Sequence, residues 1–418
     1  MTQSPYAALK LADFRLLMIG RLLTTVAVQI QAIAVGWQIY ALTKNPLSLG
    51  LVGLSEALPA IGVALYAGHV ADVVDRRRIA LWSVSALVVS MALLSFASFT
   101  VSEPNLLVGL IFTVVALSGI ARGFYGPAVF GIMADIVPRP LMGNASAWTS
   151  TVWQASAVAG PMLGGLLYVW LAASRTYLAS ALLLLASLFC FVAVKARTDL
   201  QPAKHASVVA NIKDGLRFVF SNQIILGAMA LDLFAVLFGG AVALLPIFAA
   251  EVFHMGPQAL GILRAAPSVG AVLTAVILTH HPIARHSGVV LMASVAGFGV
   301  CMIAFGLSSN FYLSLVLLVL SGVLDGVSVW VRSTIFQLVT PNDMKGRVSA
   351  VNNIFIGSSN EIGEFESGVA AKIMGLVPSV VFGGCMTLLV VLFTVFIAPK
   401  LRALHVESLY HPEDNAAD

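Results

Sequence analysis

Charged residues are scarce in this chain. Asp, Glu, Lys and Arg make up only 10% of its 418 residues, whereas 59% are hydrophobic. A soluble fold with this composition would lack the polar side chains needed to cover its surface. The sequence therefore predicts a membrane protein. The formal net charge of +4 is small and its carriers are scattered, so we expect no nucleic-acid partner.

Cysteine is also rare, and the three cysteines lie inside apolar runs. They predict neither a disulfide framework nor an oxidising compartment. The chain lacks a Gly-x-x-x-x-Gly-Lys loop, a Ser/His/Asp set and a His-rich metal spacing. We therefore expect no ATP hydrolysis, no metal site and no cofactor, and a membrane enzyme is disfavoured. The first apolar run is too long for a cleavable signal peptide.

Long apolar runs are what the chain does contain. Twelve are long enough to cross about 30 Å of hydrocarbon, at approximately 13–41, 47–70, 79–100, 105–134, 144–171, 176–195, 223–250, 257–280, 288–306, 311–338, 347–374 and 378–400. Lys and Arg concentrate in alternate connectors, which we expect to face the cytoplasm. An even number of crossings then places both termini in the cytoplasm.

The two halves of the chain carry one motif each. Residues 117–123 recur as 320–326 at a displacement of 203, so that Arg122 corresponds to Asp325. A parallel repeat of half the chain length is typical of a two-bundle membrane transporter. We expect an amphipathic surface helix in the linker, and the predicted division is a six-helix bundle at 1–199, a cytoplasmic linker at 200–222, a second six-helix bundle at 223–400 and a cytoplasmic tail at 401–418.

A motif of glycine, acid and base follows the second apolar run. Gly68 precedes Asp72, and Arg76 and Arg77 come next. The pattern resembles the cytoplasmic loop signature of the major facilitator superfamily, except that Asp75 stands where a glycine is usual. A positive-inside bias alone would explain Arg77 but not Asp72. The resemblance implies a cytoplasmic latch between the bundles, with Gly68 allowing close helix contact and Asp72 and the arginines supplying charge.

The fifth run contains a second family element. Gly160, Pro161, Gly164 and Gly165 resemble the Gly-Pro-x-x-Gly-Gly element of superfamily antiporters, although Ser156 replaces its upstream glycine. Pro161 is expected to bend the helix, because proline cannot donate to the preceding turn. The resemblance implies exchange rather than uptake. The alternative is a seam of small residues that serves packing only.

Arg122 begins a stretch that resembles the fourth-segment motif Arg-x-x-Gln-Gly, with Tyr125 replacing the glutamine. A charge at the bilayer centre costs about 2.5–3.5 kcal/mol on insertion scales, so Arg122 needs a partner. We expect Asp325, its repeat-mate, followed by Glu361 and Glu364. The pair is either a static clamp, which would matter for folding, or a proton-linked switch, which would matter for coupling.

Acids inside apolar runs of the second half predict proton coupling. Glu361 and Glu364 share a helix face, whereas Glu366 lies further round, where solvation in a wet vestibule would explain it. Three carboxylates cannot all stay ionised cheaply in a low-dielectric site. Asp232 lies alone in an apolar run and must meet a base across the bundle, for which we expect Arg264.

Polar and aromatic side chains in the runs supply candidates for a substrate pocket. Such a lining suits a bulky, partly aromatic amphiphile. Arg21 is close enough to the cytoplasmic end to extend towards water. The predicted lining residues are Gln38, Tyr125, Trp153, Gln154, Trp330 and Glu56, with Gln29, Gln31, Trp37 and Trp148 as further candidates.

The resemblance to the major facilitator superfamily covers nearly the whole chain. Within that family the chain resembles drug exporters and, more narrowly, the enterobactin-exporter group. Residues 13–15 and 345–350 also carry this resemblance. It implies an all-α fold of two pseudo-symmetric six-helix bundles in the cell inner membrane, in which alternating access exports a small organic solute against proton entry. We expect a monomer whose other partners are protons and membrane lipids. A uniporter, a lysolipid flippase, an importer and a non-transporting receptor remain alternatives.

Overall fold

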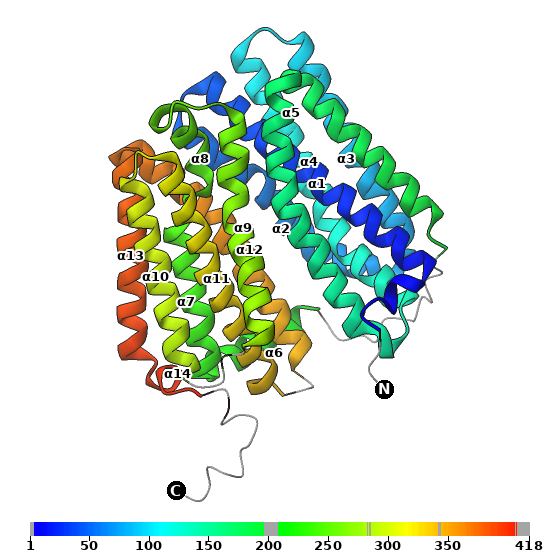
Figure 1. Ribbon diagram of the computed structural model, residues 1–418. Helices are drawn as coiled ribbons and strands as arrows, with labels where there is room; N and C mark the ends of the chain where they lie inside the picture. The colour runs from blue at the N-terminus through cyan, green and yellow to red at the C-terminus, as the bar shows by residue number, and fades with distance from the viewer. Residues whose placement is uncertain are drawn as a thin grey trace, which may run out of the picture. The chain divides into compact units, whose positions relative to one another are not determined.

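The computed structural model describes residues 4–195, 208–281, 283, 286–341, 344–405 and 407. Within these ranges the chain consists of helices and short connections without strands, which confirms the all-α prediction. The long helices (Figure 1) are α1 (Ala12–Thr43), α2 (Pro46–Val73), α3 (Arg76–Thr100), α4 (Pro104–Ile136), α5 (Met142–Ala193), α7 (Gln223–Gly239), α9 (Pro257–His280), α10 (Ser287–Leu307), α11 (Phe311–Val339), α12 (Lys345–Met374) and α13 (Leu376–Ile397). Short elements are η1 (Ala8–Lys10), η2 (Arg139–Leu141), α6 (Val208–Ser221), η3 (Ala241–Leu244), α8 (Leu245–Ile247), η4 (Phe248–Val252) and α14 (Pro399–Arg402).

Ten helical segments of the described chain are long and apolar enough to cross a membrane. One of them, Arg139–Ala193, is interrupted at Ala172, where φ is 58°. This break lies where the sequence predicts the connector between the fifth and sixth runs. The acidic helix α12 is not among the ten. The chain is therefore a multi-pass membrane protein, and twelve crossings stay a prediction.

Side-chain caps fix where several helices begin. Asn222 accepts hydrogen bonds from the backbone of the first turn of α7, and Asn310 does the same at α11. Glu103 caps α4 and Asp75 caps α3. These side chains satisfy backbone N–H groups that have no partner inside the helix. The cap explains why an acid is useful at position 75, where the resembled loop signature has glycine.

By its contacts the chain forms two compact units. Unit 1 comprises Met1–Lys44, Leu51–His205 and His254–Ala265. In this unit α1 packs along α5, and α3 packs against α4 and α5 (Figure 1). Buried aromatic and aliphatic side chains fill the space between these helices, among them Phe14, Leu87, Tyr177 and Phe191.

Unit 2 comprises Asn45–Gly50, Ala206–Phe253 and Ala266–Asp418. Here α10 packs against α11 and α13, while α7 packs against α12 and α13. The core of this unit is formed by aliphatic residues of these helices, including Leu231, Leu291, Val331 and Val391. The predicted division at 199, 222 and 400 is not tested by these units and stays a prediction.

A short helix, α6, lies between the two long stretches of helices. Its buried Val219 packs with Ile225 of α7 and with Val348 and Val351 of α12. Part of its apolar face is therefore covered by protein, and its predicted position on the membrane surface stays a prediction. The sequence shows that the helix is amphipathic but not which apolar partner it meets.

The repeat found in the sequence recurs in helix packing. A Cβ atom at Gly119 of α4 would overlap the backbone oxygen of Glu56 in α2, and one at Gly322 of α11 would overlap that of Pro267 in α9. Each glycine lets two backbones approach more closely than any side chain would permit. The same helix contact is thus built twice, once in each unit.

Candidate functional site

An ion pair joins two membrane-spanning helices of unit 1. The guanidinium of Arg122 on α4 contacts the carboxylate of Glu56 on α2. The close approach of these helices at Gly119, one turn before Arg122, brings the two side chains together. The structure thus pairs Arg122 with an acid that the sequence analysis had placed in the substrate pocket. Asp325 belongs to unit 2, and its expected pairing with Arg122 stays a prediction.

A second ion pair lies inside unit 2. Asp232 on α7 contacts Arg332 on α11, and their side chains are only 11% and 7% exposed. The Arg332 Nε also donates to the Ser328 carbonyl at 3.4 Å. This pair corrects the expectation that Arg264 balances Asp232. The signal that sequence reasoning missed was Arg332 itself, a charge in an apolar run two helical turns after Asp325.

A cavity of about 240 Å³ opens beside Arg122 in unit 1. Helix α1 contributes Arg21, α4 contributes Arg122 and Tyr125, and α5 contributes Trp153. Three predicted pocket residues, Gln29, Tyr125 and Trp153, therefore line one cavity, which Arg21 and Arg122 also line. The rest of its wall is Thr24, Thr25, Val28, Leu87, Gly126 and Val129.

Two other predicted pocket residues have packing partners instead. Gln38 is buried, accepts a hydrogen bond from the Tyr177 hydroxyl at 2.8 Å and donates to Ser98 at 3.0 Å. Trp330 packs on the aliphatic core of unit 2. Gln154 is half-buried on α5. A polar residue in an apolar run can line a cavity, or it can be buried with all its hydrogen bonds made inside the protein. The type of side chain alone does not distinguish these two cases.

The arginines of the predicted latch bind groups within unit 1. Arg76 forms an ion pair with Asp135 on α4 at 2.6 Å, and its Nε donates to the Ala71 carbonyl at 3.1 Å. A Cβ at Gly131 would overlap the Arg76 side chain, so the absence of a side chain at this glycine lets Arg76 lie across α4. Asp135 was not predicted, although it is an acid close to the end of an apolar run.

Arg77 binds the end of another helix. Its Nε donates to the Phe191 carbonyl at 3.3 Å, and a terminal nitrogen donates to the Val192 carbonyl. These are C-terminal carbonyls of α5, where a cation is favourable. A Cβ at Gly68 would meet no described atom within 4 Å, and its expected role in close helix contact stays a prediction. The backbone of Asp72 lies in α2, and its side chain is outside the described part of the structure.

The glycines of the predicted antiporter element pack against α1 and the start of α9. A Cβ at Gly160 would lie 2.5 Å from the Gln29 Cβ, and one at Gly165 would lie 2.5 Å from the Pro257 carbonyl oxygen. Gly164 approaches α1 in the same way, with a Cβ distance of 3.0 Å to Ile33. At Pro161 the backbone dihedrals stay helical and depart only at Ala172. The element therefore forms a close packing seam, and its bearing on transport direction stays a prediction.

The three acids Glu361, Glu364 and Glu366 all lie on α12 and are partly buried. Within the same stretch, a Cβ at Gly363 would lie 2.9 Å from the Leu237 carbonyl oxygen of α7. The Ser367 hydroxyl donates to the Gly240 carbonyl at 2.9 Å. This part of α12 is thus held closely against α7, the helix that carries Asp232.

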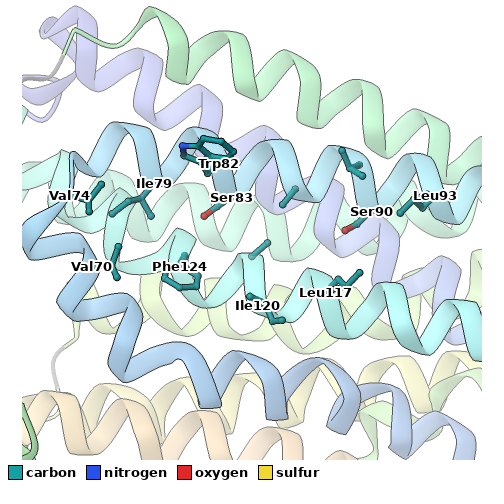
Figure 2. A pocket seen from close by; sticks show the side chains of 13 residues that line it. Val70, Val74, Ile79, Trp82, Ser83, Ser90, Leu93, Leu117, Ile120 and Phe124 are labelled. Atoms are coloured by element: carbon teal, nitrogen blue, oxygen red, sulfur yellow. The ribbon is translucent and has the colours of Figure 1, made fainter.

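A larger hollow of about 640 Å³ lies between α2, α3 and α4 (Figure 2). Its wall is apolar apart from two serine hydroxyls, and Trp82 on its rim is 75% exposed. Phe96 and Phe99 on the same helix are also exposed. An exposed apolar surface of this kind is expected to contact lipid hydrocarbon chains rather than water. We therefore assign the hollow to the lipid-facing surface and not to a solute site.

The described residues contain no group of three or more His, Cys, Asp or Glu side chains that could hold a metal ion. His286 and His405 contact each other, with the His286 backbone N–H donating to the His405 Nδ1 at 3.0 Å.

Comparisons with known proteins find relatives that match nearly the whole chain. The model of the family described as transmembrane secretion effector matches residues 3–416. The chain is 25% identical over 402 residues to the enterobactin exporter EntS of Citrobacter koseri, covering 93% of this chain and 92% of that one. It is 27% identical over 404 residues to the enterobactin exporter EntS of Shigella boydii, with the same coverage.

Solved structures share the fold. A D-xylose-proton symporter matches with a TM-score of 0.72 at 14% identity, over 95% of this chain and 98% of that one. A bacterial homologue of the iron transporter ferroportin in the inward-facing state matches with a TM-score of 0.70 at 16% identity, over 94% and 99%.

Proposed function

The chain belongs to the transmembrane secretion effector family of the major facilitator superfamily, and from this premise we propose that it is a proton-coupled antiporter. It is a multi-pass membrane transporter of a small molecule and not an enzyme. The proposed transport is export of a bulky amphiphilic solute, siderophore-like or drug-like, from the cytoplasm across the inner membrane by alternating access. Twelve crossings, cytoplasmic termini and a monomeric state are parts of the same proposal.

The observation that carries this proposal is the buried pair of Asp232 and Arg332. Ionisable groups inside a membrane are costly and mark proton or solute pathways. Protonation of Asp232 would release Arg332, so the pair has two states that differ by one proton. Arg122 and Glu56 give unit 1 a second pair of the same kind. Similarity to enterobactin exporters supports the export direction.

Transport in proteoliposomes tests the proposal. Purified protein is reconstituted, a pH difference is imposed, and movement of candidate lipophilic cations, siderophores and lysolipids is measured. Substrate-dependent dissipation of the pH difference is expected. Asp232→Asn, Asp325→Asn, Glu361→Gln and Glu364→Gln are compared one at a time, and loss of pH-driven accumulation in at least one is expected.

Asp214→Asn is the matched control, because Asp214 lies on α6 outside the long helices and its side chain is 55% exposed. Transport that needs no pH difference would instead identify a uniporter or a flippase. Solute accumulation on the side opposite to export would identify an importer. A protein that binds solutes but moves none would be a receptor.

A further inference from the structure

One arginine of the unit 1 cavity makes no ion pair with the residues that the structure describes. Arg21 lines the cavity from α1. Among the residues that the structure describes, its guanidinium makes no ion pair and no hydrogen bond, whereas its backbone carbonyl accepts a bond from Thr25. The position lies nine residues into α1, or about 13 Å from the start of the helix. The expected extension of Arg21 towards the cytoplasmic end stays a prediction.

The described charges of unit 1 at this cavity do not balance. Arg21 and Arg122 contribute two positive charges, and Glu56 neutralises Arg122. One positive charge remains in a space walled mainly by apolar and aromatic groups. A charge inside a membrane-spanning bundle is costly unless it has a partner. An anionic group of a bound solute would supply the missing charge, and guanidinium binds carboxylates with two parallel hydrogen bonds.

Aromatic side chains elsewhere in the cavity favour a ligand with an aromatic ring next to its anionic group. Trp153 is 50% exposed and presents its ring to the cavity, and Tyr125 lies opposite the same space on α4. The Tyr125 hydroxyl is buried beside Thr24, so the part of Tyr125 that serves the subsite is its ring. The cavity of about 240 Å³ is smaller than the roughly 300–1,000 Å³ of sites for drug-sized ligands. It therefore fits one ring system and its acid group rather than an entire bulky solute.

We propose that this cavity is a subsite for an aromatic anion, in which Arg21 binds the acid group and Trp153 and Tyr125 contact the ring. The substrate class is then an organic solute that carries a carboxylate, or an anion of similar geometry, on or beside an aromatic ring. This inference rests on the proposed transport function for its biological use. The subsite itself is defined by binding alone.

Equilibrium binding tests the subsite without transport. The full-length protein in detergent is titrated calorimetrically with 1-naphthoate and with 1-naphthamide, which share a ring system and differ in charge. The wild type is expected to prefer naphthoate by about tenfold to a hundredfold, the range for a hydrogen bond to a charged group. Arg21→Gln should abolish this preference, and Arg21→Lys should retain part of it.

Arg139→Gln is the matched control, because Arg139 is an exposed arginine of η2 outside the cavity and its loss should leave the preference unchanged. Trp153→Ala should weaken both ligands by a similar factor, since both use the ring contact. Equal binding of the two probes by the wild type, or an unchanged preference in folded Arg21→Gln protein, would overturn the inference. Arg21-dependent binding without any transport would overturn the proposed function and leave the subsite standing.

Discussion

At the scale of single residues, arginines in the long helices differ in how their charge is balanced. Arg332 is buried with Asp232, and Arg122 is half-exposed with Glu56. Arg21 lines a cavity and has no counterion in the described part of the chain. A buried pair is held by mutual attraction that must offset the loss of hydration. An arginine without such a partner that also lines a cavity, as Arg21 does, can bind an anionic ligand. The surroundings of each arginine, more than its type, thus decide between structural and binding roles.

The pair of Asp232 and Arg332 yields a stability prediction. Asp232→Ala leaves a buried guanidinium without its carboxylate, which costs about 3–5 kcal/mol for a buried pair. The expected result is a clear fall in the thermal unfolding temperature of the purified protein, followed by intrinsic fluorescence. Asp214→Ala, which removes an exposed partner of Arg347, should change stability by no more than about 1 kcal/mol.

Combining Asp232→Ala with Arg332→Met should recover much of the lost stability, because no buried charge then remains. A single variant as stable as the wild type would show that the pair is not a clamp. Recovery of stability in the double variant without recovery of pH-driven transport would assign the pair to coupling as well.

At the scale of helices, glycine decides which pairs of elements pack closely. Gly119 and Gly322 occupy equivalent positions of the repeat and bring α4 against α2 and α11 against α9. Gly160 and Gly164 do the same for α5 against α1. Helices in a membrane gain little from hydrophobic burial between them, so close van der Waals contact and interhelical polar contacts matter more. The Arg122–Glu56 pair depends on one of these contacts.

A single helix offers a matched pair of glycine substitutions. Gly119→Ala places a methyl group against the α2 backbone and should cost about 1–3 kcal/mol, the range for overpacking. Gly109→Ala lies in the same helix, where a Cβ would meet no described atom within 4 Å, and should be neutral or stabilising by up to about 1 kcal/mol.

Thermal unfolding of both variants measures the difference. Equal effects at the two positions would contradict the close contact of α2 and α4. Gly322→Ala should behave like Gly119→Ala if the repeat preserves the contact in unit 2.

At the scale of the whole molecule, each unit is assembled from helices that are distant in the chain. α1 packs along α5 in unit 1, and α7 packs along α12 and α13 in unit 2. Lys and Arg concentrate in alternate connectors of the sequence, and the positive-inside rule then predicts the direction of each helix in the membrane. The orientation predicted from these charges assigns Arg139 to the cytoplasm and Glu103 to the opposite side.

Labelling of single cysteines tests this orientation. The three native cysteines are replaced by serine, and Glu103→Cys and Arg139→Cys are introduced separately. In intact cells a membrane-impermeant maleimide should modify the variant at position 103 and not the variant at 139. Permeabilised cells should show modification of both. The reverse pattern would invert the predicted topology.

The sequence by itself determined the class of protein, the repeat and most helix positions. These properties depend on composition, on the length of apolar runs and on motif spacing, all of which are local along the chain. It also identified most charges of interest, including Asp232 and Arg122, because a charge in an apolar run is visible without a structure.

Only the tertiary structure decided which charges meet. Asp232 pairs with Arg332 rather than Arg264, the acid at Arg122 is Glu56, and Arg76 pairs with Asp135. The physical reason is that a partner across a bundle depends on helix rotation and on where glycines allow close approach. Neither the rotation of a helix nor the site of close approach can be read from a periodic pattern in the sequence.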